Sequence, residues 1–117
     1  MSTITEPRDA VLLYPGHEWG LFSADVLQLD AGADLLATLQ SIVGGYVEAL
    51  ALKPEAASAL RELTGAELRE VPGARLVLVV NDAAALEPAS NPLNAFASAV
   101  TAAGHAVRGV AVVVALE

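Results

Sequence analysis

Cysteine is absent from the 117 residues of this chain, which excludes disulfide scaffolds, thiolate zinc sites and cysteine nucleophiles. Aromatic residues make up only 4% of the sequence. Basic residues are also scarce, since six Lys and Arg against fourteen Asp and Glu give a net charge of −8. Because these six are scattered singly, no basic patch is present, and we expect no direct contact with nucleic acid.

A long hydrophobic run is also missing. The longest apolar stretch, near the C-terminus, is far shorter than the about 20 residues of a membrane helix. Residues 1–9 have the features of neither a signal peptide nor a transit peptide. We therefore expect a cytoplasmic protein with no membrane association. The length predicts a single domain over residues 10–117, preceded by a flexible N-terminal tail over residues 1–9.

The sequence does contain hydrophobic patterning, within an apolar content of 55%. Short alternating or aliphatic segments predict strands at 10–14, 21–29, 46–52, 76–80 and 110–116. The run 76–80 is apolar on both faces, which is typical of a strand covered on both sides. The strand at 110–116 is strongly aliphatic, and if it formed an exposed sheet edge, a homodimer would be expected.

Two segments predict the main helices. Asp30 is expected to cap the first helix, which Gly44-Gly45 ends. Asn91 is expected to cap the second, with Pro92 in its first turn. A further, optional helix over 54–63 lies in a segment expected to be an exposed arm. The fold class is therefore α+β: a mixed β-sheet of about five strands packed with two main helices, in the order β-β-α-β-(α)-β-α-β.

Motifs for chemistry are few. The sequence has no nucleophile elbow, no phosphate-binding loop and no dinucleotide fingerprint, so we expect no cofactor and no catalytic residue. His17 stands beside Glu18, but no third ligand has metal spacing, so we expect no metal site. Asn81-Asp82 follows the strand at 76–80, where a polar pair could bind a ligand or simply form a turn.

Several residues form the candidate binding set. Trp19 and Tyr46 are large rings in an aromatic-poor chain, and each is expected to anchor a core or an interface. Polar residues that lie within or after a predicted strand, or at the expected start of the second main helix, complete the set. The full set of candidate binding residues is Trp19, Tyr46, Glu48, Asn81, Asp82 and Asn91.

Four fragments in order resemble a known family. They are Val-Gly-Gly-Tyr-Val-Glu at 43–48, a strand ending in Asn-Asp at 76–82, Asn-Pro-Leu-Asn-Ala at 91–95, and Gly109 before the last strand. This pattern resembles domain-of-unknown-function family 3846, small bacterial, phage and plasmid proteins, over about residues 20–116. The resemblance implies no established activity. It implies a setting in phages, plasmids and mobile elements, in the cytoplasm of a host cell.

These observations leave three functional hypotheses. The first is a non-enzymatic binding or protein-interaction domain, an accessory protein of a phage or mobile element, whose partner is another protein. The second is a small-ligand-binding or enzymatic domain that uses Asn81, Asp82 and Asn91 with Glu48 or His17. The third is an acidic DNA mimic, which would need dense rows of carboxylates. The missing catalytic motifs favour the first.

Overall fold

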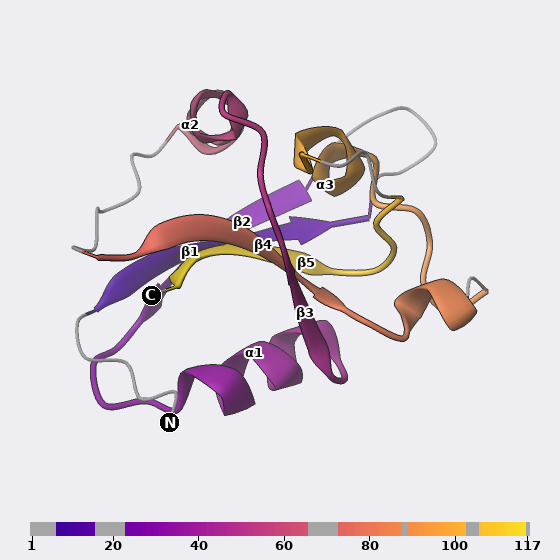
Figure 1. The fold of residues 1–117 in the computed structure, drawn as a ribbon, viewed down its shortest axis with the longest axis horizontal. Coiled ribbons are helices and arrows are strands. Elements are labelled where there is room, and N and C mark those ends of the chain that lie inside the picture. The colour runs from indigo at the N-terminus through magenta and orange to yellow at the C-terminus, as the bar shows by residue number, and fades with distance from the viewer. Residues whose placement is uncertain (1–6, 16–22, 66–72, 88, 103–105, 117) are drawn as a thin grey trace.

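The chain forms a β-sheet with helices on both faces (Figure 1). The computed structural model describes residues 7–15, 23–65, 73–87, 89–102 and 106–116. The elements are β1 (Arg8–Tyr14), β2 (Ser23–Leu29), α1 (Leu35–Val43), β3 (Val47–Leu50), α2 (Ala56–Thr64), β4 (Arg75–Asn81), a 3-10 turn (Ala84–Leu86), α3 (Ala95–Val100) and β5 (Ala111–Leu116). The predicted α+β class, the five strands and the optional helix are confirmed. β1 begins at Arg8, within the segment that was expected to be a tail.

The sheet has the strand order β2-β1-β5-β4-β3. All four strand pairs are antiparallel, so the described strands form an antiparallel sheet rather than the predicted mixed one. The reason lies in the connections. The segments that enter and leave α3 pair with each other through Leu93 and Arg108. The chain therefore returns to the end of the sheet that it left, and β5 runs antiparallel to β4.

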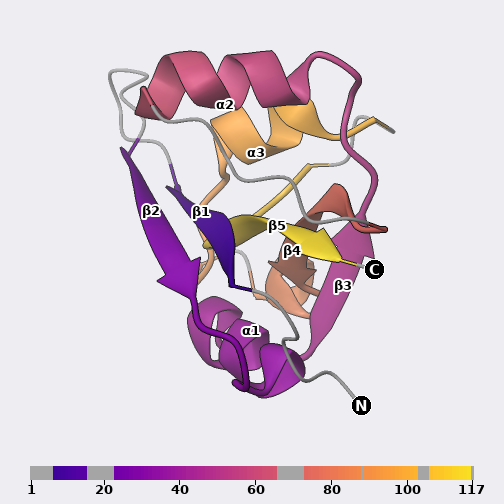
Figure 2. The ribbon, with the colours of Figure 1, turned by 90° about the vertical axis from the view of Figure 1, so that its left-hand side faces the viewer.

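β5 is the middle strand of the sheet, between β1 and β4. Its residues Ala111–Ala115 are buried. The argument for a homodimer required this strand to be an exposed edge, so the structure removes that argument. The edges are β2 and β3, which α1 connects by crossing one whole face of the sheet (Figure 2).

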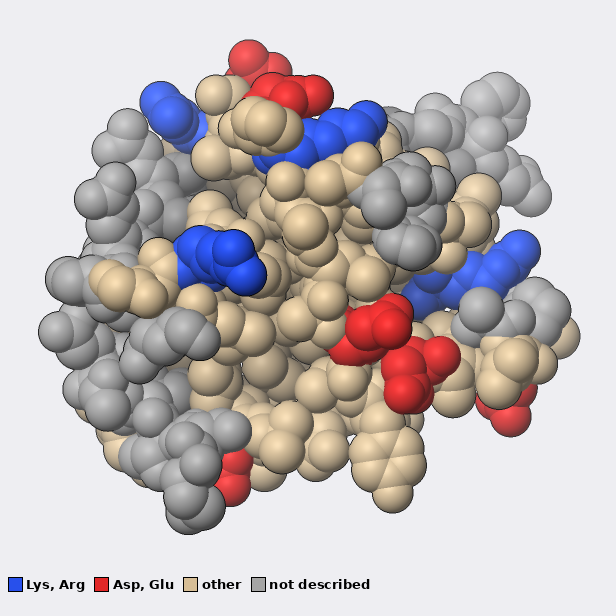
Figure 3. Space-filling model, in the orientation of Figure 1, with Lys and Arg blue, Asp and Glu red and all other residues tan. Residues whose placement is uncertain are grey.

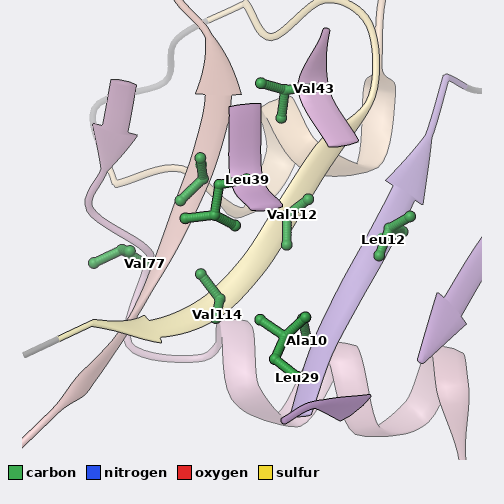
Figure 4. Close-up of a cluster of buried hydrophobic side chains, with 9 residues drawn as sticks. Ala10, Leu12, Leu29, Leu39, Val43, Val77, Val112 and Val114 are labelled. Carbon is green, nitrogen blue, oxygen red and sulfur yellow. The ribbon is translucent and has the colours of Figure 1, made fainter. Parts of the chain in front are cut away.

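Alternation along the strands divides the core into two clusters, one on each face. The face covered by α1 contains Leu39 and Val43 of that helix, and alternate residues of the strands meet them (Figure 4). The other face lies under α2 and α3 (Figure 2), where Leu60 and Ala97 pack against the intervening strand residues. Because successive side chains of a strand point to opposite faces, continuous aliphatic strands can supply both clusters.

The helix starts differ from the prediction. Asp34, not Asp30, caps α1 by accepting a hydrogen bond from the Ala37 amide. Asn94, not Asn91, caps α3 in the same way. In each case a good capping residue stands three or four positions upstream of the true cap, and local sequence does not choose between them. Gly44 does end α1, with a left-handed backbone at φ 83°.

The segment expected to be an exposed arm contains α2, and this expectation was wrong for one side of that helix. Ala56 and Leu60 are buried, at 2% and 1% exposure, and Leu60 belongs to the second core cluster. None of the described helices has the length and apolar character needed to cross a membrane.

Candidate functional site

Most of the candidate binding residues lie at one end of the sheet. Tyr46 and Glu48 lie at the start of β3, Asn81 ends β4 and Asp82 follows it. Asn91 lies in the connection between the 3-10 turn and α3. Trp19 lies outside the described residues, as do His17 and Glu18.

Backbone pairing brings the Gly-Gly-Tyr segment and the Asn-Asp segment together. Val47 pairs with Asn81, and the Asp82 amide donates to the Tyr46 carbonyl oxygen at 3.0 Å. The register therefore continues one residue beyond β3, with Tyr46 opposite Asp82. Opposed residues in an antiparallel pair project to the same side of the sheet. Glu48, two residues along β3, projects to that side as well.

The Asn81 side chain is used within the fold. Its amide nitrogen Nδ2 donates to the Val43 carbonyl oxygen at the end of α1, at 3.3 Å. Its oxygen Oδ1 accepts a hydrogen bond from the Ala83 amide at 2.9 Å. One side chain thus ties the end of α1 to the turn after β4. This is the turn-forming interpretation of the Asn81-Asp82 pair rather than the ligand-binding one.

Gly45 lies beside Asn81 and leaves room for its side chain. Unlike Gly44, it does not have a positive φ. A Cβ atom at Gly45 would lie 2.9 Å from Asn81 Nδ2 and 3.1 Å from Asn81 Oδ1. The glycine therefore lets the Asn81 amide reach the end of α1.

Three candidate side chains near the start of β3 and the end of β4 are exposed. The Tyr46 ring is 76% exposed, which rules out a role as a core anchor. The Glu48 and Asp82 side chains are also exposed. In Figure 3, which has the orientation of Figure 1, a group of carboxylates lies beside the lower half of β3 and over the end of β4. We call Tyr46, Glu48 and Asp82 the β3 corner.

Asn91 lies apart from the β3 corner and has a different set of partners. Its side-chain nitrogen donates to the Glu87 carbonyl oxygen at 3.0 Å, and its own carbonyl accepts from Arg108 Nη1 at 3.3 Å. A Cβ atom at Gly109 would lie 3.1 Å from Asn91 Oδ1. These contacts join the entry to α3 with the entry to β5.

Asn94 is the polar residue at this end of the sheet that sequence reasoning undervalued. Its side chain is fully buried and makes three hydrogen bonds. Nδ2 donates to the carbonyl oxygens of Leu13 and Gly109, both at 2.9 Å, while Oδ1 accepts from the Ala97 amide. Asn94 thereby connects β1, α3 and the entry to β5. The signal in the sequence was a second asparagine directly before the apolar stripe of the helix.

The candidate side chains at this end fall into two groups, those bonded within the fold and those left exposed. The side-chain amides of Asn81, Asn91 and Asn94 donate to backbone carbonyl groups, and the exposed candidate side chains are the Tyr46 ring and the carboxylates of Glu48 and Asp82. Within the described ranges, no three His, Asp or Glu side chains form a group that could hold a metal ion. On the face drawn in Figure 3, the carboxylates form separate groups rather than a continuous row, which gives DNA mimicry no support there.

Comparisons with known protein families, with curated proteins and with solved structures find no match for this chain. The resemblance of its motifs to domain-of-unknown-function family 3846 therefore stays a prediction. What the structure adds is the reason for the spacing of those motifs: Gly45-Tyr46 packs on Asn81-Asp82, and Asn91 to Asn94 packs on Gly109.

Proposed function

We propose that this chain is a non-enzymatic protein-interaction domain that contacts its partner through the β3 corner. The observation that supports the proposal is the exposure of Tyr46, at 76%, beside two exposed carboxylates. Tyrosine is enriched at protein interfaces because its ring supplies apolar area while its hydroxyl stays hydrogen-bonded. Burying an exposed ring of this size against a partner is favourable by about 25 cal/mol for each Å² of apolar area.

The setting proposed for this function follows from the family resemblance. In this proposal the chain is an accessory protein of a phage or mobile element. It acts in the cytoplasm of a host cell, and its partner there is another protein. The charge of −8 supports a protein partner over nucleic acid, because a negative surface repels phosphates.

Site-specific photocrosslinking tests this proposal. A photoreactive phenylalanine analogue replaces Tyr46 in one sample and Val26 in a control, and each protein is irradiated in a lysate of the source organism. Val26 is a suitable control because it is 43% exposed on β2, at the opposite edge of the sheet. We expect a discrete protein adduct from position 46 that is absent from position 26. Equal adducts from both positions, or none from position 46, would refute the proposal.

A matched pair of substitutions then tests the contact. Tyr46→Ala should reduce recovery of the crosslinked partner at least about tenfold in a pull-down, as expected of a central interface residue. Val26→Ala should leave recovery within about twofold, since β2 is not part of the β3 corner. Both variants should unfold within about 1 kcal/mol of the parent chain, which circular dichroism in urea checks.

A further inference from the structure

The outer edge of β3 has backbone groups that point away from the sheet. Antiparallel pairs alternate between hydrogen-bonded and non-hydrogen-bonded residues. The bond from the Asp82 amide to the Tyr46 carbonyl makes Tyr46 and Asp82 a hydrogen-bonded pair. It follows that Glu48 and Leu50 bond to β4, while the amide and carbonyl groups of Val47 and Ala49 face outward.

A short segment of the chain already uses the next part of this edge. The Ala102 amide donates to the Ala51 carbonyl at 2.9 Å, and the Lys53 amide donates to the Val100 carbonyl at 2.8 Å. Leu52 and Thr101 form the antiparallel bridge between these two bonds. The edge therefore accepts an extended strand from Ala51 onward. Before that point, no hydrogen-bond partner for the outward groups of Val47 and Ala49 occurs among the described residues.

From this geometry we infer that an extended, basic segment of the partner protein adds to the sheet as a sixth strand, antiparallel to β3 along Val47–Ala49. The inference rests on the proposed function and specifies its chemistry. Strand addition is an established mode of peptide recognition, in which main-chain hydrogen bonds give affinity and alternate side chains give specificity. Here the two sides of the added strand would meet different surroundings.

Charge decides which kind of segment fits. Glu48 projects from β3 toward the face covered by α2 and α3, opposite Val80. The Tyr46–Asp82 pair continues the same register two residues further along. A lysine or arginine on that side would meet Glu48 across the new strand pair and would lie near the exposed Tyr46 ring. On the other side, Val47 packs with the α1 core cluster, so an apolar residue fits there. A segment that alternates basic and apolar residues matches both sides.

Charge also argues against a second copy of this chain as the added strand. Pairing β3 with its own copy through both Val47 and Ala49 places Glu48 directly opposite its counterpart. Like charges in that position are destabilising. The net charge of −8 on each copy adds to this repulsion.

Fluorescence anisotropy with defined peptides tests the chemistry of the segment. The probe is a labelled heptapeptide that alternates Lys and Val, and the matched controls alternate Glu and Val or carry Pro at the central Val. We expect the Lys-Val peptide to bind at least about tenfold more tightly than either control, because charge and main-chain donors are both needed. Equal binding of the Lys-Val and Glu-Val peptides would overturn the inference.

Amide hydrogen exchange locates the peptide without any substitution. In the free protein, the Val47 and Ala49 amides should exchange rapidly, while those of Glu48 and Leu50 should be protected by β4. Saturation with the Lys-Val peptide should slow Val47 and Ala49 at least about tenfold and leave Glu48 and Leu50 unchanged. Unchanged rates at Val47 and Ala49 would place the peptide elsewhere and refute strand addition. The same would follow if both amides became protected with rising protein concentration alone, since a second copy would then occupy the edge.

A matched pair of charge substitutions completes the test. Glu48→Gln should weaken the Lys-Val peptide about threefold, whereas Glu62→Gln, on the exposed side of α2, should leave binding unchanged. Equal effects of the two substitutions would indicate general attraction to an acidic protein and would contradict the assigned edge. If crosslinking from position 46 succeeds while the exchange experiment fails, the protein-interaction function stands and only the strand addition is wrong. If crosslinking from position 46 fails, the proposed function itself is refuted.

Discussion

Two asparagines stabilise the same end of the sheet and differ in how deeply they lie. Asn94 is fully buried, and its three hydrogen bonds connect β1, α3 and the entry to β5. Asn81 is half-buried, and its two bonds connect the end of α1 to the turn after β4. Asn94 therefore lies at a junction that is closed within the fold, whereas the neighbours of Asn81, Tyr46 and Asp82, remain exposed. The first supports the domain, and the second presents a surface.

The largest expected effect is at the buried junction. Asn94→Ala should lower the free energy of unfolding by about 3 kcal/mol, because it leaves the buried carbonyl group of Leu13 and the part-buried one of Gly109 with one bond fewer and removes the cap. Asn94→Asp keeps an equally good cap but loses both amide donors, so it should be no more stable than Asn94→Ala. Urea unfolding measures both. If Asn94→Asp left the free energy of unfolding nearly unchanged, Asn94 would be only a helix cap, and the contrast between the buried and the half-buried junction would be contradicted.

Gly109 tests the same junction from its other side. Its φ is 75°, and a Cβ there would lie 3.1 Å from Asn91 Oδ1. Gly109→Ala should therefore cost about 1–2 kcal/mol, from the left-handed backbone and the contact together. Gly32→Ala is the control, because Gly32 has a similar φ of 90° but no atom lies within 4 Å of the position of a new Cβ. Urea unfolding measures both variants, and the additional loss of unfolding free energy in Gly109→Ala relative to Gly32→Ala is the cost of the contact with Asn91.

The half-buried junction should show a smaller and coupled effect. Gly45→Ala should destabilise the chain by about 1 kcal/mol, because the new methyl group displaces the Asn81 amide from its bonds. Asn81→Ala alone should cost about as much. In the double variant the two costs should not add, since the amide that would clash is gone. Additive costs would show that the Gly45 and Asn81 contact is not what requires a glycine.

The smallest effect is expected at a polar contact near the same end of the sheet, between Tyr14 and Asp25. The Tyr14 hydroxyl donates to Asp25 Oδ2 at 2.9 Å. That bond, followed by desolvation and by the charge of Asp25, raises the pKa of Tyr14 above its ordinary value of about 10. The folded state then holds the proton more tightly than the unfolded state. The contribution is present below about pH 10 and is lost as the pH rises through the folded-state pKa.

Tyr14→Phe tests this contribution. Urea unfolding of the parent chain and of the variant between about pH 8 and pH 11 should show a slightly steeper loss of stability in the parent chain at the alkaline end. A steeper loss in the variant would reverse the sign and contradict the assigned bond. The small size of the effect, beside that of Asn94, would confirm that burial rather than the number of polar contacts decides their weight.

The candidate site was partly predictable from the sequence. Tyr46, Asn81 and Asp82 were identified as candidates, and the structure brings them together through the pairing of β3 with β4. Asn91 was also identified, but it belongs to the α3 entry, and its expected role as a cap falls to Asn94. Which side chains remain exposed could not be predicted, because exposure depends on contacts between segments far apart in the chain. Tyr46 is the clearest case, since a rare aromatic ring fits a core or an interface equally well on composition alone.

The sequence by itself determined the elements of this protein. Alternating and aliphatic runs specify five strands, and apolar stripes at helical spacing specify the helices, because these patterns depend on neighbours within a few positions. Only the tertiary structure decided the order and direction of the strands, which place β5 in the middle and leave β2 and β3 as edges. It also decided the burial of Arg8, whose Nη1 donates to the Ala115 carbonyl at 2.6 Å from the opposite end of the chain. The physical reason is that strand pairing and burial join residues remote in sequence, so no local pattern specifies them.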